Sequence, residues 1–109
     1  MMYESFRLTT TGGTALTLDP SSIEGQRFID GHRNSQIEVE GLGGGSYSVF
    51  LRHPNGSRFI EHIGGAGEND TVMLTGDRAP LYEAVRLVFS NVPAGQESVI
   101  RVTTWPRMI

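Results

Sequence analysis

The acidic side chains that could carry out acid–base chemistry are few and scattered in this sequence. Glu38 and Glu40 alternate with apolar residues, which would place both carboxylates on one face of a strand, about 7 Å apart. Glycosidases use carboxylate pairs at such separations. Alternation with Ile37 and Val39 is also the pattern of the solvated side of a half-buried sheet. We therefore expect a polar sheet face here rather than a catalytic pair.

Possible metal ligands do not show the spacing of a metal site. The histidines are His32, His53 and His62, and no His-x-His or His-Glu-x-x-His pattern occurs. Glu61 and His62 are neighbours, which a strand would turn to opposite faces. The stretch 68–70 offers oxygen ligands that calcium accepts but lacks the spacing of an EF-hand, so we interpret it as a solvated turn. The sequence predicts no metal and no cofactor.

Two residue types are missing, and their absence excludes several mechanisms. The chain has no cysteine, and all nine of its basic residues are arginine. Thiol nucleophiles, disulfide scaffolds and lysine Schiff bases are therefore excluded, whereas bidentate arginine–carboxylate pairing remains available. The glycine-rich stretch 41–46 lacks the Gly-Lys-Ser/Thr of a P-loop, and no Gly-x-Ser-x-Gly elbow occurs. We expect that stretch to be a connection and the protein to lack enzymatic activity.

The length and charge of the chain narrow the class of protein further. Its 109 residues are predicted to form a single domain, 1–109. The formal net charge of −3 is too small to indicate disorder or a nucleic-acid partner. No window approaches the ~18 apolar residues of a membrane span, and the N-terminus does not resemble a secretion signal. We expect neither a membrane nor a nucleic acid as partner.

The elements that must position these side chains are predicted to be strands. The 14 glycines fall in clusters that divide the chain into short segments. Those segments are rich in β-branched and aromatic residues, or alternate between polar and apolar ones. The clearest are 6–8, 37–40, 47–52, 71–75, 85–89 and 99–105. We predict an all-β fold, an antiparallel, jelly-roll-like β-sandwich of about eight or nine strands.

Two local features refine that prediction. Pro54-Asn55-Gly56-Ser57 lies between the strand-like runs 48–53 and 58–63, and Asn-Gly readily adopts the positive φ angles of a tight hairpin. The segment 79–89 has a helical alternative, with Asp77 as a cap. Its β-branched and aromatic second half favours a strand, which leaves at most one helical turn near Leu81.

The C-terminal end carries the residues that we predict to contact another protein. Trp105 ends the last predicted strand, and Pro106 interrupts ladder pairing there. Arg107, Met108 and Ile109 then form an apolar tail with one charge. Trp, Arg and Met are enriched at protein interfaces, and extended segments can join a sheet edge. Tyr3 is the fifth interface candidate, and the alternative for Trp105 is that its ring closes the core.

The second half of the chain also carries a resemblance to a known family. The run from Val85 through Pro93-Ala94-Gly95, followed by the strand Val99 to Trp105, resembles the small capsid decoration, or cement, proteins of tailed bacteriophages. The resemblance implies a jelly-roll-like sandwich on the capsid exterior that bridges subunits of the major capsid protein. It also implies a homo-oligomer, with a dimer favoured over a trimer, synthesis in the host cytoplasm and no catalytic residues.

Other functions remain open at the level of sequence. A carbohydrate-binding or adhesion module would present aromatic rings such as those of Tyr47, Tyr82 and Trp105 to a sugar. A small hydrolase would need a histidine and a carboxylate within hydrogen-bond reach inside a pocket. We expect a non-enzymatic structural protein of a phage virion, with the carbohydrate-binding module as the alternative.

Overall fold

Eight strands form two antiparallel sheets of four strands each in the computed structural model, which describes residues 3–22, 25, 33–75 and 82–106. The strands are β1 (Glu4–Thr11), β2 (Leu16–Leu18), β3 (Arg33–Glu40), β4 (Ser46–Arg52), β5 (Ile60–Ala66), β6 (Val72–Leu74), β7 (Ala84–Ser90) and β8 (Glu97–Pro106). The prediction of an all-β fold with about eight strands is confirmed.

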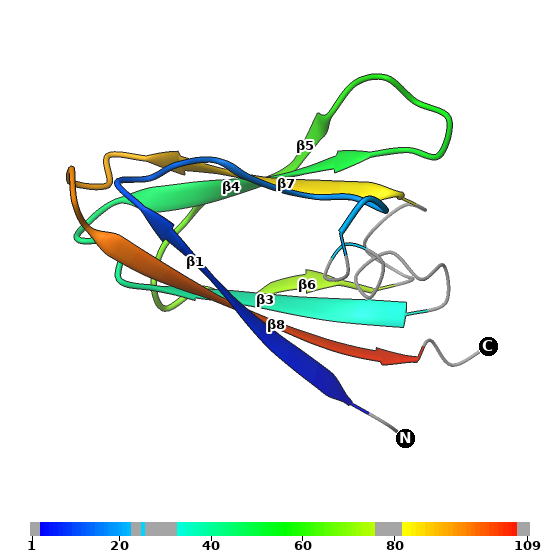
Figure 1. Cartoon of the computed structure of the whole chain (residues 1–109), viewed down its shortest axis with the longest axis horizontal. Helices are drawn as coiled ribbons and strands as arrows, with labels where there is room; N and C mark the ends of the chain where they lie inside the picture. Colours follow the sequence, from blue (N-terminus) through cyan, green and yellow to red (C-terminus); the bar gives the residue numbers. More distant parts are fainter. Residues whose placement is uncertain (1–2, 23–24, 26–32, 76–81, 107–109) are drawn as a thin grey trace.

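The strand order is that of a rolled-up antiparallel ribbon. One sheet has the order β1-β8-β3-β6 and the other β2-β7-β4-β5. Strands β1 and β2 thus pair with β8 and β7, while β3 and β4 pair with β6 and β5. Each strand is followed by a strand of the other sheet, except β4, which is followed by β5 in its own sheet. This winding is typical of a jelly roll. Figure 1 shows the sheets as two layers, with the start of β1 and the end of β8 at one end of the molecule.

The core lies between the sheets and is built from alternate residues of each strand. In β4 the burial alternates without exception, and Tyr47, Val49 and Leu51 point inward. The same period-two pattern in β8 buries Ile100 and Val102 and leaves Arg101 exposed. This alternation allows a chain with 38% hydrophobic residues to cover both inner faces of a sandwich and keep polar outer faces.

The hairpin predicted around Asn55 is present, with a longer loop than a two-residue turn. Residues 53–59 connect β4 to β5, and Leu51 pairs with Ile60. The Gly56 N–H donates to the His53 carbonyl at 2.9 Å, and Asn55 has φ 62°. Proline followed by a residue of positive φ is typical of a type II turn. Pro54 and Asn55 therefore occupy the central positions of the turn, and of the predicted Asn-Gly pair only Asn55 has a positive φ.

Strand β5 differs from the predicted strand, which covered 58–63 and ended before the glycines. The observed strand begins at Ile60 and continues through Gly64 and Gly65 to Ala66. Its register against β4 shifts twice, which is the mark of extra residues inserted as bulges. Gly65 has φ +68°, a conformation that glycine adopts without strain. The glycines expected to form a turn thus bend a continuing strand.

The segment with both a helical and a strand interpretation is a strand where the structure describes it. β7 covers Ala84–Ser90 and pairs along its length with β4. The preference for a strand is confirmed there, and the helical turn predicted near Leu81 lies outside the described residues. Central position in the sheet explains the choice, because β-branched side chains pack well on a pleated surface that is covered by the other sheet.

Candidate functional site

Tyr3 and Trp105, from opposite ends of the chain, form one aromatic pair. Their ring centroids lie 6.0 Å apart at an interplanar angle of 43°. Trp105 belongs to the outward-facing set of β8 that includes Arg101 and Thr103, so its half-buried ring does not close the core. Tyr3 is 65% exposed. The pair is therefore a surface feature, of a kind enriched at protein interfaces. Arg107, Met108 and Ile109 lie outside the described residues.

Strand β1 leaves one side of its backbone open along a sheet edge. Residues of an antiparallel strand alternately bond to the neighbour and face away from it. Directly after β1, the Gly12 N–H donates to the Gln96 carbonyl at 2.8 Å, in register with the β1–β8 ladder. Because bonding residues alternate along the strand, the even-numbered residues of β1 bond to β8, as Gly12 does. The backbone N–H and C=O of Ser5, Arg7 and Thr9 therefore face away from β8, and no described strand pairs with them.

The inward side chains of β1 are only partly covered. Phe6 and Leu8 pack against the core without belonging to its fully buried set. An edge strand has a neighbour on one side only, which leaves apolar side chains at the border of the core in reach of solvent. A strand added beside β1 would bury more of Phe6 and Leu8 and satisfy the free backbone groups of the odd-numbered residues at the same time.

The outer face of this sheet is polar and carries mixed charge. Arg7, Arg101 and Glu38 stand opposite one another across β1, β8 and β3. An Arg101 Nη lies 3.8 Å from a carboxylate oxygen of Glu40. Gln36 Nε2 donates to Glu38 at 2.9 Å. Arg7, Gln36, Glu38 and Arg101 are among the residues that line an open depression of about 420 Å³. Exposed pairs of this kind contribute little to stability, so the face is suited to wet, hydrogen-bonded contacts.

The expected solvated role of the two strand carboxylates is confirmed. Ile37 and Val39 are fully buried, while Glu40 is exposed and Glu38 half-buried on the opposite side of β3. Within the described ranges no group of three or more His, Cys, Asp or Glu side chains could hold a metal ion. His32 lies outside those ranges, and His62 occupies a bulge of β5.

The acidic turn 68–70 and the glycine-rich connection 41–46 are linked to each other. A Glu68 carboxylate oxygen accepts the backbone N–H of Leu42 at 2.6 Å, and an Asp70 carboxylate oxygen accepts that of Gly67 at 2.8 Å. Leu42 itself is fully buried and anchors the connection in the core. Both predictions, a turn and a connection between strands, are confirmed. The carboxylates hold backbone donors of the loops that join the sheets.

Two of the three aromatic residues suggested for sugar binding are inside the protein, which corrects that interpretation. Tyr47 is fully buried and Tyr82 is 6% exposed. The Tyr47 hydroxyl donates to the Asp70 carbonyl at 3.5 Å. Burial, together with the nearby charges of Asp70 and Glu38, raises the pKa of Tyr47 to about 12. The alternation of Tyr47 with Val49 and Leu51 was the available signal for its inward direction.

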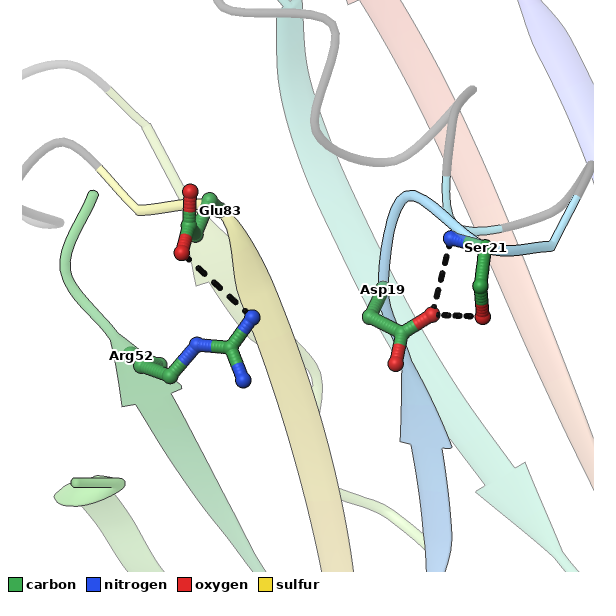
Figure 2. A network of polar contacts seen from close by, with 4 residues as sticks. All are labelled: Asp19, Ser21, Arg52 and Glu83. Atoms are coloured by element: carbon green, nitrogen blue, oxygen red, sulfur yellow. Dashed lines mark hydrogen bonds and ion pairs between the residues drawn. The ribbon is translucent and has the colours of Figure 1, made fainter. Parts of the chain in front are cut away.

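Polar contacts at the ends of β2 and β4 secure two connections (Figure 2). The Asp19 carboxylate accepts both the hydroxyl and the backbone N–H of Ser21, the latter at 2.9 Å. These bonds, aided slightly by Arg52 and opposed by burial, lower the pKa of Asp19 below its usual value. Arg52 Nη2 lies 3.4 Å from a Glu83 carboxylate oxygen, and the Arg52 carbonyl accepts the Glu83 N–H at 2.9 Å.

These features define a small β-sandwich with jelly-roll strand order, whose candidate sites are surfaces. The described residues include no helix long and apolar enough to cross a bilayer. No family model matches the chain, and the search of curated proteins also gives no significant match.

Solved structures with a similar fold include domains of a large peptidase. The chain resembles part of the IMPa metallopeptidase in complex with T-antigen, with a TM-score of 0.52, 18% identity, 96% of this chain and 13% of that chain covered. It is similarly related to IMPa from Pseudomonas aeruginosa in complex with an O-glycopeptide, with a TM-score of 0.51, 19% identity and 97% and 13% coverage. The chain thus spans about an eighth of the length of those proteins. Likeness at this identity concerns the fold.

Proposed function

We propose that this protein is a non-enzymatic structural protein that bridges neighbouring protein chains, and that it acts as a decoration protein on the capsid of a tailed phage. The observation that carries the bridging role is the open edge of β1, bordered by the exposed Tyr3 and its partner Trp105. An edge of this length supplies backbone hydrogen bonds, and the aromatic pair supplies apolar area. The choice of a capsid rests on the sequence resemblance of the segment 85–105.

The open edge also supports a homodimer. Two copies of β1 placed antiparallel about a twofold axis would join two four-stranded sheets into one continuous sheet of eight. Such pairing uses the free backbone groups of Ser5, Arg7 and Thr9 in both copies. A register that puts Arg7 opposite itself is disfavoured by charge repulsion, whereas one centred on Leu8 pairs Arg7 with Thr9. The apolar side chains at the border of the core would then cover each other.

The test is to identify what the protein binds in its native source. Affinity purification followed by mass spectrometry is expected to recover a major capsid protein as the principal partner. Adding the purified protein to shells that lack it should raise the temperature at which those shells fall apart, because a ligand of the assembled state stabilises that state. Recovery of partners that belong to no virion, or unchanged melting of the shells, would overturn the capsid role.

A further inference from the structure

The sheet β2-β7-β4-β5 carries a groove on its outer face, separate from the open edge of β1. β4 and β7 form its floor, and the connection 53–59 supplies further lining residues. It is an open groove of about 670 Å³. Three arginines, Arg52, Arg58 and Arg86, line it together with Phe50 and Phe59. A third of the chain's nine basic residues therefore meets at one place.

Arg86 is held in a fixed orientation in this groove. Its guanidinium carbon lies 4.0 Å from the centroid of the Phe59 ring, which is cation–π contact. Its Nε donates to the Thr17 hydroxyl oxygen at 3.1 Å. The Phe59 ring covers one face of the guanidinium and Thr17 binds its Nε, so the two contacts together fix the orientation of the guanidinium plane. Among the described residues, Arg86 pairs with no carboxylate. A preorganised guanidinium with free terminal nitrogens is the arrangement that binds a carboxylate in a bidentate manner.

The other charges of the groove leave it positive. Arg52, 5.4 Å from the same Phe59 ring, is compensated by Glu83, and its Nε is buried with no hydrogen-bond partner in the described part of the chain. Arg58 is exposed and, within that part, forms no ion pair. Glu61, opposite Phe50 in the β4–β5 ladder, is the remaining nearby carboxylate of the sheet. Three arginines thus face two carboxylates, which leaves the described surroundings of the groove with one net positive charge.

We propose that this groove binds an acidic segment of a partner protein, with a carboxylate on Arg86 and Arg58 and an adjoining apolar side chain against Phe50. A peptide is favoured over a nucleic acid because the whole chain has a net charge of −3 and would repel an extended polyanion. The inference uses the proposed function only to suggest that the partner is a capsid subunit. Whether the groove binds an acidic peptide can be tested without knowing whether the partner is a capsid subunit.

The experiment is an NMR titration of the full-length protein with a blocked Gly-Glu-Phe-Glu-Gly peptide. Its counterpart Gly-Gln-Phe-Gln-Gly and sodium glucuronate serve as separate arms. We expect the acidic peptide to shift the signals of Phe59 and the Arg86 side chain, to bind more weakly as salt is raised, and to bind more tightly than either other ligand. Equal binding of the glutamine peptide, tighter binding of glucuronate, or no shifts at Phe59 and Arg86 would each overturn the proposal.

A matched pair of variants tests the position of the site. Arg86→Gln removes the preorganised guanidinium and should weaken acidic peptide binding at least roughly tenfold, as expected for loss of a charge-assisted hydrogen bond. Arg101→Gln makes the same change in charge on the opposite sheet and should leave the affinity unchanged. If both variants weaken binding equally, overall charge rather than the groove is responsible and the proposal is wrong. Should Arg86→Gln not fold, Arg58→Gln takes its place, with a smaller expected loss in affinity.

Discussion

At the scale of single residues, inward or outward direction decides which side chains are available for function. Alternation correctly predicted that Ile37 and Val39 face the core and that Glu38 and Glu40 face solvent. The same rule applied to β4 separates Tyr47, with its neighbours Val49 and Leu51, from the outward Phe50. The suggestion that Tyr47 presents its ring to a sugar overlooked this pattern. The alternation does not predict which residues an outward side chain contacts in the folded protein, such as the contact of Arg86 with Phe59.

The buried Tyr47 gives the protein a specific sensitivity to alkaline pH. A tyrosine that titrates near pH 10 when unfolded and near 12 when folded keeps its proton longer in the folded state. The free energy of unfolding therefore falls as pH rises between those values, by on the order of 1–2 kcal/mol. Tyr47→Phe has no proton to lose, and denaturant unfolding at neutral and alkaline pH should show a smaller decline than wild type.

The control for that measurement is Tyr3→Phe, which changes an exposed tyrosine and should retain the decline of the wild type. A Tyr47→Phe protein whose stability falls as steeply as that of the wild type would show that another group causes the alkaline transition. Near neutral pH the substitution removes only the 3.5 Å hydrogen bond to the Asp70 carbonyl and should cost no more than about 1 kcal/mol.

At the scale of elements, the sequence was most informative about strands rich in β-branched and aromatic residues and least about short, bent or polar ones such as the first half of β3. β4, β7 and β8 consist of continuous β-branched and aromatic runs, and each lies within about two residues of its predicted bounds. β2 has three residues and was not predicted individually, because so short a segment has almost no period to detect. β5 was predicted to begin at 58 and end at 63, before its glycines, because glycine signals a turn and a bulged strand equally well.

The connection between β3 and β4 allows a comparison of two glycines in one loop. Gly41 has φ +77°, and an added Cβ would lie 2.5 Å from the Glu97 carbonyl oxygen. Gly44 has φ +90° with open space around it. Gly41→Ala should therefore lower the free energy of unfolding by about 2–4 kcal/mol, the range for strain combined with overpacking. Gly44→Ala should cost about 1–2 kcal/mol from its backbone conformation alone.

Thermal or denaturant unfolding of both variants measures the difference. The carbonyl of Gly41 also accepts the Ser98 hydroxyl at 2.9 Å, so displacement of this residue disturbs a second contact with β8. Equal destabilisation by the two substitutions would mean that the loop relaxes away from Glu97 and that the close approach has no energetic consequence.

The open edge of β1 makes a separate prediction about self-association. The backbone N–H of Thr9 faces away from β8, so Thr9→Pro removes a free donor without breaking a ladder hydrogen bond. We expect this variant to keep its stability to within about 1 kcal/mol and to be a monomer by light scattering at concentrations where the wild type is a dimer. Thr9→Ala, which retains the N–H, should remain a dimer. A Thr9→Pro dimer of unchanged affinity would exclude β1 pairing.

At the scale of the whole molecule, the two candidate surfaces lie on opposite sheets. The β1 edge and the Tyr3–Trp105 pair belong to the sheet β1-β8-β3-β6, and the arginine groove belongs to β2-β7-β4-β5. A rigid sandwich with binding surfaces on both sides can hold two neighbours at a fixed separation, which requires no reactive group. Its contribution to an assembly then depends on simultaneous engagement of both surfaces, because the second contact benefits from the high effective concentration set by the first.

If the protein is a bridge, changing either surface alone should abolish the stabilisation of the shells even where some binding to the shells remains. Thr9→Pro leaves the arginine groove intact, so this monomer should still co-sediment with shells at high protein concentration. Arg86→Gln retains only the self-pairing β1 edge and should co-sediment weakly. Neither should raise the melting temperature of the shells as the wild type does, since a molecule held at one surface links nothing. The double variant should not co-sediment at all. If either single variant stabilises the shells fully, one surface is sufficient and the protein acts as a cap on individual subunits rather than as a bridge between them.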